Sequence, residues 1–171
     1  MLIDKYAMHY GLQLGLYWIV VFFVRILVAF YPVFSVLYVI MLIFTLYLCF
    51  RFGKIYLSAM NEAGKKVMLL QFMGFGIMLF FYAGLMDALV QFIYYRFINP
   101  NYISQQIEAS MAILRQMKSA EHLLELYNQF GAPSARQMAM QIIWNSVLSG
   151  GIIFILLSPF LLSKQKVVKT S

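Results

Sequence analysis

Asp87 is the side chain in this sequence whose type and position most strongly suggest chemistry. It lies in an apolar run, residues 67–98, whose only other strongly polar side chains are Gln71, Gln91 and Arg96. A lone charge in the hydrocarbon of a membrane costs about 2.5–3.5 kcal/mol on insertion scales, so such residues pair with one another or mark substrate, ion or proton pathways. A carboxylate in this run therefore needs a partner or a role.

Arg25 is the candidate partner of Asp87. About 20 residues of helix cross a hydrocarbon core, so Asp87 falls near the outer boundary if the lysines that precede its run mark the inner headgroups. Arg25 lies five residues before Phe30, about 7–8 Å beneath the same boundary at about 1.5 Å per residue. We expect an Arg25–Asp87 ion pair. The alternatives are that Arg25 reaches the interface alone and that Asp87 meets Arg96 or water.

Polar side chains on three apolar segments predict a shared site. At about 100° per residue, Asp87 and Gln91 lie on one helical stripe, and a fourth apolar segment has its own polar stripe. We expect a polar cluster inside the bundle, toward its outer face, formed by Arg25, Asp87, Gln91, Gln141 and Asn145. Such a cluster acts either as hydrogen-bonding glue that fixes helix register or as a headgroup, ion or proton site.

Small residues accompany these polar side chains. In membranes, small residues let helix backbones approach closely, because no hydrophobic force drives the helices together. Two glycines in a GxxxG pattern open the first apolar segment, and small residues share the polar stripes of the others. The residues that we expect to pack helix against helix are Gly11, Gly15, Gly76, Gly84 and Ser149.

The elements that position these residues follow from the composition. The chain has 171 residues, of which 63% are hydrophobic and 11% charged, whereas soluble domains have about 45–50% apolar and about 25% charged residues. We expect an all-α integral membrane four-helix bundle forming a single membrane domain over residues 1–171. Its predicted spans are about 7–30, 33–50, 67–98 and 136–162, with Asn99-Pro100 ending the third.

The sequence between the third and fourth spans predicts an extracytoplasmic amphipathic helical hairpin over residues 101–131. Apolar residues recur there at helical spacing, with charged residues among them. One interpretation is that its apolar side rests on the membrane surface or on the bundle. The other is that it docks a partner protein.

The distribution of Lys and Arg predicts the orientation. With both termini in the cytoplasm, eight of the 13 basic residues lie on that side, near short loops where the positive-inside rule is strongest. The formal net charge of +7 then reflects basic rims that face anionic membrane lipids rather than nucleic acid.

Residues for catalysis or metal binding are sparse. Cys49 is the only cysteine, so neither a disulfide framework nor a CxxC site forms within one chain. His9 and His122 fall on opposite sides of the membrane in the predicted topology and cannot share a metal. No GxSxG, HExxH, Walker or GxGxxG pattern is present. We expect neither an enzyme nor a cofactor or metal site.

Four stretches of the sequence carry a family resemblance. "YGLQLGL" opens the first span, "FINPNY" ends the third, a Met- and Gln-bearing hairpin follows, and "NSVLSGGIIFILL" precedes a lysine tail. In this order they resemble the bacterial inner-membrane family catalogued as domain of unknown function 4199. The resemblance covers nearly the whole chain and implies a four-helix protein of the bacterial inner (cytoplasmic) membrane, without an established activity or catalytic residues.

Two functions compete at this stage. The first is a non-enzymatic membrane subunit or scaffold that binds another envelope protein, such as a lipid-linked sugar transferase. The alternative is a small carrier or lipid-handling protein that uses the Arg25/Asp87 cluster. Four spans are few for alternating access, so the alternative needs a homodimer, for which Gly11 and Gly15 offer a contact.

Overall fold

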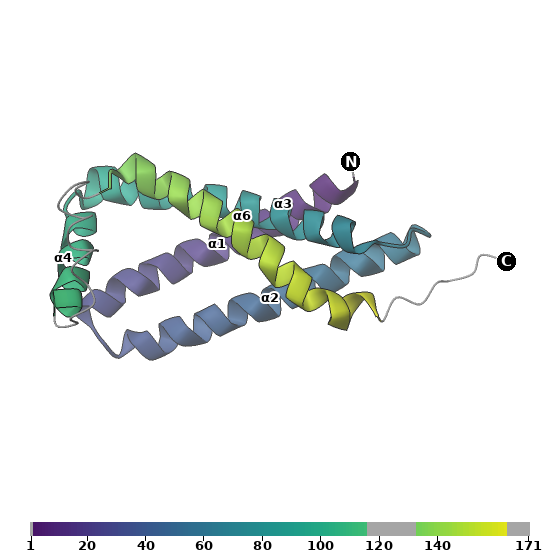
Figure 1. The fold of residues 1–171 in the computed structure, drawn as a ribbon, viewed down its shortest axis with the longest axis horizontal. Coiled ribbons are helices and arrows are strands. Elements are labelled where there is room, and N and C mark those ends of the chain that lie inside the picture. Colours follow the sequence, from purple (N-terminus) through teal and green to yellow (C-terminus); the bar gives the residue numbers. More distant parts are fainter. Residues whose placement is uncertain (1, 116–132, 164–171) are drawn as a thin grey trace. The chain divides into compact units, whose positions relative to one another are not determined.

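The protein is all-helical over the residues that the computed structural model describes, which are 2–115 and 133–163 (Figure 1). Four helices are long and apolar enough to cross a membrane, and they cover Asp4–Phe30, Phe34–Glu62, Leu69–Ile98 and Ala135–Leu162. The expected all-α fold with four spans is confirmed, and it is the fold of a multi-pass membrane protein.

The first two spans form a helical hairpin. Helix α1 (Leu2–Phe30) is followed by α2 (Phe34–Glu62) after a turn that contains Pro32. The turn is closed by hydrogen bonds from the Phe34 amide to the Tyr31 carbonyl, 3.0 Å, and from the Ser35 amide to the Pro32 carbonyl, 2.9 Å. Such a short connection places consecutive helices antiparallel and side by side, as Figure 1 shows for α1 and α2.

Helix α2 continues to Glu62, past Phe50, where the hydropathy pattern places the end of the second span. The basic residues that suggest an end there do not break a helix, because their side chains are exposed and lie on its outer surface. The break comes at Gly64, whose φ of +67° is a left-handed conformation that glycine adopts easily. A hydrogen bond from the Lys65 amide to the Met60 carbonyl, 2.9 Å, closes this helix end.

The third span changes its helical type near its end. Helix α3 (Leu69–Ile93) passes directly into a π-helical segment, η1 (Tyr94–Ile98). The Asn99 amide donates to the Tyr94 carbonyl over 2.9 Å, and Asn99 then turns to φ −137°, ψ 81°. A residue that precedes proline favours extended backbone, so the span ends where Asn99-Pro100 predicts.

An amphipathic helix follows the third span. Helix α4 (Tyr102–Arg115) buries Tyr102, Ile103 and Met111 and exposes polar residues such as Glu108. The second helix of the predicted hairpin lies outside the described residues.

The fourth span, α6 (Ala135–Leu162), begins with a capping box. The Gln137 amide donates to Ser134 Oγ over 3.3 Å, and the Ser134 amide donates to Gln137 Oε1 over 2.8 Å.

The contacts divide the chain into two compact units. Unit 1 contains Met1–Asp87 and Ile143–Ser171, and unit 2 contains Ala88–Ile142. The expected single domain stays a prediction.

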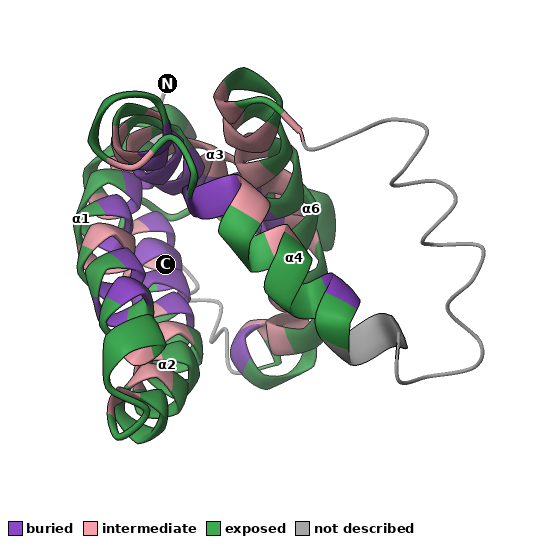
Figure 2. Cartoon of the chain, turned by 90° about the vertical axis from the view of Figure 1, so that its left-hand side faces the viewer, coloured by how far each residue is buried: buried purple, intermediate pink, exposed green. Residues whose placement is uncertain are grey.

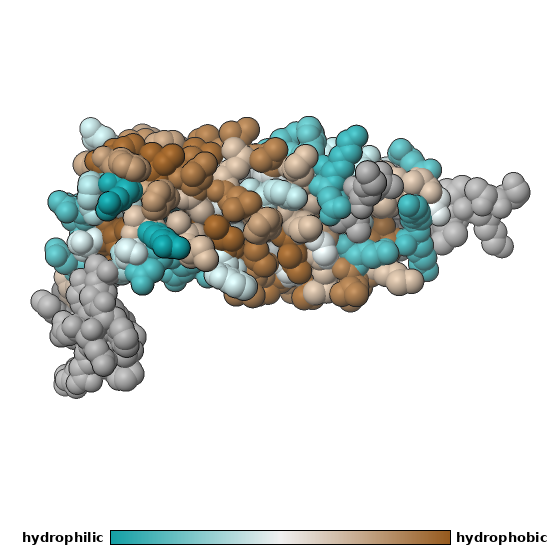
Figure 3. Space-filling model, turned by 90° about the horizontal axis from the view of Figure 1, so that it is seen from above, coloured by the Kyte–Doolittle hydropathy of each residue, from teal (hydrophilic) through white to brown (hydrophobic). Residues whose placement is uncertain are grey.

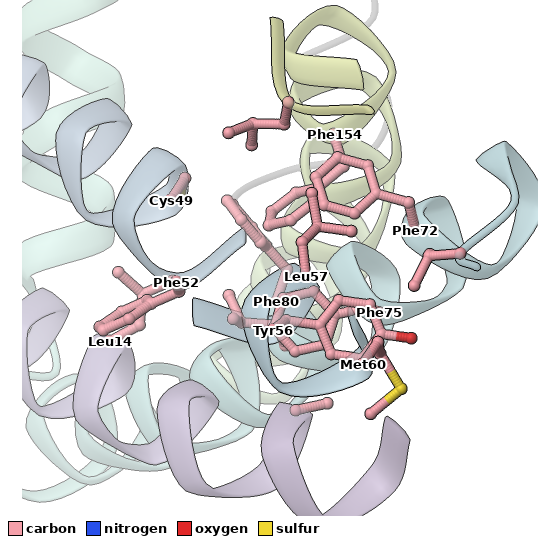
Figure 4. Packing of buried hydrophobic residues seen from close by; sticks show 14 of the residues in the cluster. Leu14, Cys49, Phe52, Tyr56, Leu57, Met60, Phe72, Phe75, Phe80 and Phe154 are labelled. Atoms are coloured by element: carbon pink, nitrogen blue, oxygen red, sulfur yellow. The ribbon is translucent and has the colours of Figure 1, made fainter. Parts of the chain in front are cut away.

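The core of unit 1 is a group of aromatic rings on α2, α3 and α6 (Figure 4). Tyr56 and Phe75 stack with ring centroids 4.2 Å apart and an interplanar angle of 3°. Phe154 packs tilted against Phe72, at 5.0 Å, and edge-on to Phe75, at 5.6 Å. Phe72, Phe75 and Phe154 are fully buried, so this group holds three helices together.

The outer surfaces of the long helices are apolar. Buried residues follow limited faces of the helices, and exposed residues occupy the rest (Figure 2). Many of these exposed side chains are large and hydrophobic, among them Leu16, Ile43, Leu148 and Leu156. Hydrophobic side chains cover much of the face shown in Figure 3. Such a surface is unfavourable in water and suits hydrocarbon.

Candidate functional site

Helix α3 carries the buried carboxylate. Asp87 is 8% exposed, while Phe72, Leu79 and Ala83 on the same helix are fully buried. Lipid alone can cover an apolar helix surface in a membrane. This face of α3 is instead covered by other helices of the protein. The inward direction that the small and polar stripe predicts for Asp87 agrees with this burial.

Helix α1 approaches α3 through Gly11 and Gly15. A Cβ atom at Gly11 would lie 2.7 Å from the Leu79 carbonyl oxygen, and one at Gly15 would lie 3.1 Å from the Ala83 carbonyl oxygen. Both neighbours are backbone atoms and cannot turn aside as a flexible side chain can. The two glycines therefore set how closely α1 packs on α3.

Helix α6 approaches α3 through Gly76, Gly84 and Gly150. A Cβ at Gly84 would lie 2.7 Å from Ser146 Cβ, and one at Gly150 would lie 2.8 Å from the Gly76 carbonyl oxygen. Gly84 lies three residues before Asp87, almost one turn of α3. The carboxylate thus follows directly after the stretch of α3 that α1 and α6 both contact.

Arg25 has a different environment from Asp87. Its side chain is exposed on α1, whereas Asp87 is buried. The predicted pair between the two stays a prediction. Arg25 lies close enough to the end of α1 for its long side chain to extend toward the headgroups, the alternative that its position in the sequence leaves open.

The polar residues predicted on α6 are exposed. Gln141, Asn145 and Ser149 all lie on the outside of this helix. Asn145 forms no hydrogen bond within the described parts of the chain. The buried face of α6 is instead formed by the smaller residues Ser146 and Gly150, together with Phe154.

Ser146 and Gly150 are packing residues that the polar pattern misses. They stand four residues apart, so they form a small-xxx-small pair that opposes the small residues of α3. That spacing is visible in the sequence and could have identified the buried face. The polar stripe points to the neighbouring face instead.

In unit 2, the fifth residue of the predicted cluster, Gln91, belongs to a buried polar group. Gln91 is 7% exposed, and its Oε1 atom accepts a 2.7 Å hydrogen bond from the Tyr95 hydroxyl. The Tyr95 ring stacks on the Tyr102 ring of α4 with centroids 5.6 Å apart. The Tyr94 ring meets the Tyr102 ring edge-on, with centroids 5.5 Å apart. Tyr95 therefore links an amide of the third span to the start of the amphipathic helix, a role without a signal in the hydropathy pattern.

Few groups suited to bond-making chemistry lie close together. Within the described ranges, no set of three or more His, Cys, Asp or Glu side chains could hold a metal ion. Cys49 is fully buried on α2. The buried and exposed polar side chains of α3 and α6 are suited to hydrogen bonding, ion binding or contact with another molecule.

Comparison with protein families gives a match over most of the chain. A family model described as protein of unknown function, DUF4199, matches residues 9–163, nearly the whole chain. The comparisons with curated proteins and with solved structures give no match.

Proposed function

The chain belongs to the DUF4199 family, and we propose that it is a non-enzymatic membrane subunit that binds another envelope protein through the exposed polar face of α6. The observation that carries this proposal is the exposed amide of Asn145. The proposal includes a lipid-linked sugar transferase as a type of partner.

The depth of Asn145 makes its exposure costly in lipid. Helix α6 has 28 residues, so it is about 42 Å long at about 1.5 Å per residue, against a hydrocarbon core of about 30 Å. Asn145 follows Ala135 by ten residues, or about 15 Å along the helix axis. If α6 is centred on the hydrocarbon core, about 6 Å of the helix extends beyond the core at each end. The Asn145 amide then lies about 9 Å inside the hydrocarbon.

An amide at that depth needs a hydrogen-bonding partner. Asn has two donors and an acceptor, and lipid tails supply none. Ser149, one turn further, can bond the carbonyl of its own helix, whereas Asn in a span usually bonds across a helix interface. A polar residue of another protein's span would satisfy Asn145 and give the contact specificity.

Co-purification with a variant of Asn145 tests the proposal. In the full chain extracted in mild detergent from its native membrane, Asn145→Leu should lower the amount of the co-purifying membrane protein about threefold to twentyfold, the range expected for one interhelical hydrogen bond. Ile43→Ala, which changes an exposed apolar residue of α2 instead of the α6 face, should leave it unchanged. Purification of the wild-type chain alone, with no second protein, would remove the basis of the proposal.

The burial of Asp87 favours a second candidate, a homodimeric carrier or lipid-handling protein. A carboxylate buried in a membrane span suits ion or headgroup binding. In this case the co-purifying species is a second copy of the chain, and Asp87→Asn lowers transport or lipid binding while the dimer persists. Transport and lipid binding that are unchanged in Asp87→Asn would argue against this candidate.

A further inference from the structure

A cavity of about 300 Å³ opens at the start of α1, apart from the buried face of α3. It is lined by Lys5, Tyr6, His9 and Tyr10. These residues stand at positions i, i+1, i+4 and i+5, so they share one side of the helix. One cation, one imidazole and two phenol groups therefore face a single space.

The cavity lies at the depth of lipid headgroups. The first span, Asp4–Phe30, has 27 residues and is about 40 Å long, about 10 Å longer than the hydrocarbon core. With the excess shared between its two ends, Lys5 and Tyr6 lie in the headgroup region, and His9 and Tyr10 lie at the boundary. Tyrosine is enriched at this level because its ring is apolar and its hydroxyl is polar.

The aromatic wall of the cavity is held in place by packing. Tyr10 stacks on Phe52 of α2 with ring centroids 5.0 Å apart, and on Tyr6 at 6.3 Å. The His9 ring meets Tyr10 edge-on at 5.1 Å. Contacts from both helices fix the Tyr10 ring, so the shape of the wall does not depend on a bound molecule.

His9 is oriented to donate a hydrogen bond. Its Nε2 atom lies 3.1 Å from Nε2 of Gln13, which is a donor only. The imidazole Nε2 therefore accepts this bond, and neutral His9 carries its proton on Nδ1. This leaves the Nδ1–H group as a donor on a ring that lines the cavity. The described lining contains no carboxylate that would repel an anion.

An apolar stripe runs from this cavity along α1. Met8, Leu12 and Leu16 stand four residues apart, and they are 46%, 41% and 57% exposed. They form a continuous apolar surface on one side of the helix, adjacent to the lining residues. A free phosphate would not use this surface, but an acyl chain lies naturally along it.

We propose that the cavity formed by Lys5, Tyr6, His9 and Tyr10 binds the phosphate headgroup of an anionic phospholipid, whose acyl chain lies along Met8, Leu12 and Leu16. Lys5 supplies the charge and His9 a directed hydrogen bond. This site is separate from the α6 face of the proposed partner contact and holds whether or not that contact exists.

Native mass spectrometry of the full chain in detergent micelles tests this site. The micelles contain phosphatidylglycerol or phosphatidylcholine, and the measured quantity is the fraction of protein that retains one lipid. We expect clear retention of phosphatidylglycerol over phosphatidylcholine. Lys5→Gln should lower it about fivefold, the effect of one basic residue near anionic headgroups, and His9→Phe should lower it while keeping an aromatic ring.

Lys54→Gln is the matched control. Lys54 is an exposed lysine of α2 outside the cavity lining, so this variant removes the same charge. Equal losses in Lys5→Gln and Lys54→Gln would show diffuse attraction by the basic rim and would overturn the site. Equal retention of the two lipids, or full displacement of phosphatidylglycerol by millimolar inorganic phosphate, would also overturn it. Asn145→Leu should lose the partner protein but retain the lipid as wild type does, because the lipid site and the partner contact are independent.

Discussion

Gly76→Ala should destabilise the contact between α3 and α6 substantially. The added Cβ would clash with Cγ of Phe154 and would lie 2.5 Å from its Cδ2 and 2.7 Å from its Cβ. These atoms are near the Phe154 backbone or in its ring, and the ring is fully buried between Phe72 and Phe75. It therefore cannot swing aside without breaking those contacts. Overpacking of this kind costs about 1–3 kcal/mol.

Gly74→Ala is the matched control on the same helix. A Cβ at Gly74 meets no atom within 4 Å. Both substitutions gain the helix propensity of alanine over glycine, about 1 kcal/mol, and this gain cancels when the two variants are compared. The free energy of unfolding of Gly76→Ala should thus be about 1–3 kcal/mol lower than that of Gly74→Ala.

The assay is unfolding of the full chain in mild detergent micelles by increasing mole fractions of SDS, followed by circular dichroism and tryptophan fluorescence. Phe154→Leu in the Gly76→Ala background should recover part of the loss, because the smaller side chain makes room for the new methyl group. If Gly76→Ala and Gly74→Ala unfold at the same SDS fraction, the close packing of α3 on α6 is refuted.

Three further substitutions test other contacts by the same unfolding assay. Tyr17→Phe removes a 2.7 Å hydrogen bond to the Met41 carbonyl between α1 and α2 and should cost about 0.5–1.5 kcal/mol; no change would mean that this bond contributes nothing. Tyr95→Phe should cost a similar amount by removing the bond to Gln91, and the cost should be smaller in a Gln91→Leu background. Gly150→Ala places a Cβ 2.8 Å from a backbone oxygen and should cost about 1–3 kcal/mol, so a stability equal to that of wild type would contradict the described packing.

Hydropathy alone predicts the four spans and most of their bounds. The turn at Pro32 and the end at Asn99-Pro100 follow from the restricted backbone of proline and of the residue before it. The end of α2 does not follow, because Arg51 and Lys54 resemble the border of a span but lie on the exposed surface of a longer helix. Basic residues indicate where a helix leaves the hydrocarbon, but they do not indicate where the helix ends.

The buried face of α6 shows a different limit of sequence reasoning. An expectation that polar residues in a span face inward selects Asn145 and Ser149. The structure buries Ser146 and Gly150 instead, next to them along the chain, because α3 and α6 approach closely at Gly76 and Gly84 and only small residues leave room there. Size complementarity depends on the opposing helix, and a hydropathy pattern does not contain that information.

The sequence does predict that Asp87 and Gln91 point inward. Their position on the small-residue stripe of α3 is sufficient for this, and both are buried. The side chains that meet them come from other elements, such as Tyr95 for Gln91. The spacing of residues along the chain predicts which face of a helix a side chain lies on, but it does not predict which side chain of another element contacts it.

Site-specific photo-crosslinking at position 145 tests the central claim most directly. A photoreactive residue is placed there in the full chain, in its native membrane, and at Ile43, an exposed apolar position on α2, as the reference. The account predicts one discrete protein adduct at position 145, with a mass that differs from twice that of the chain, and none at position 43. Only lipid adducts at both positions would contradict it.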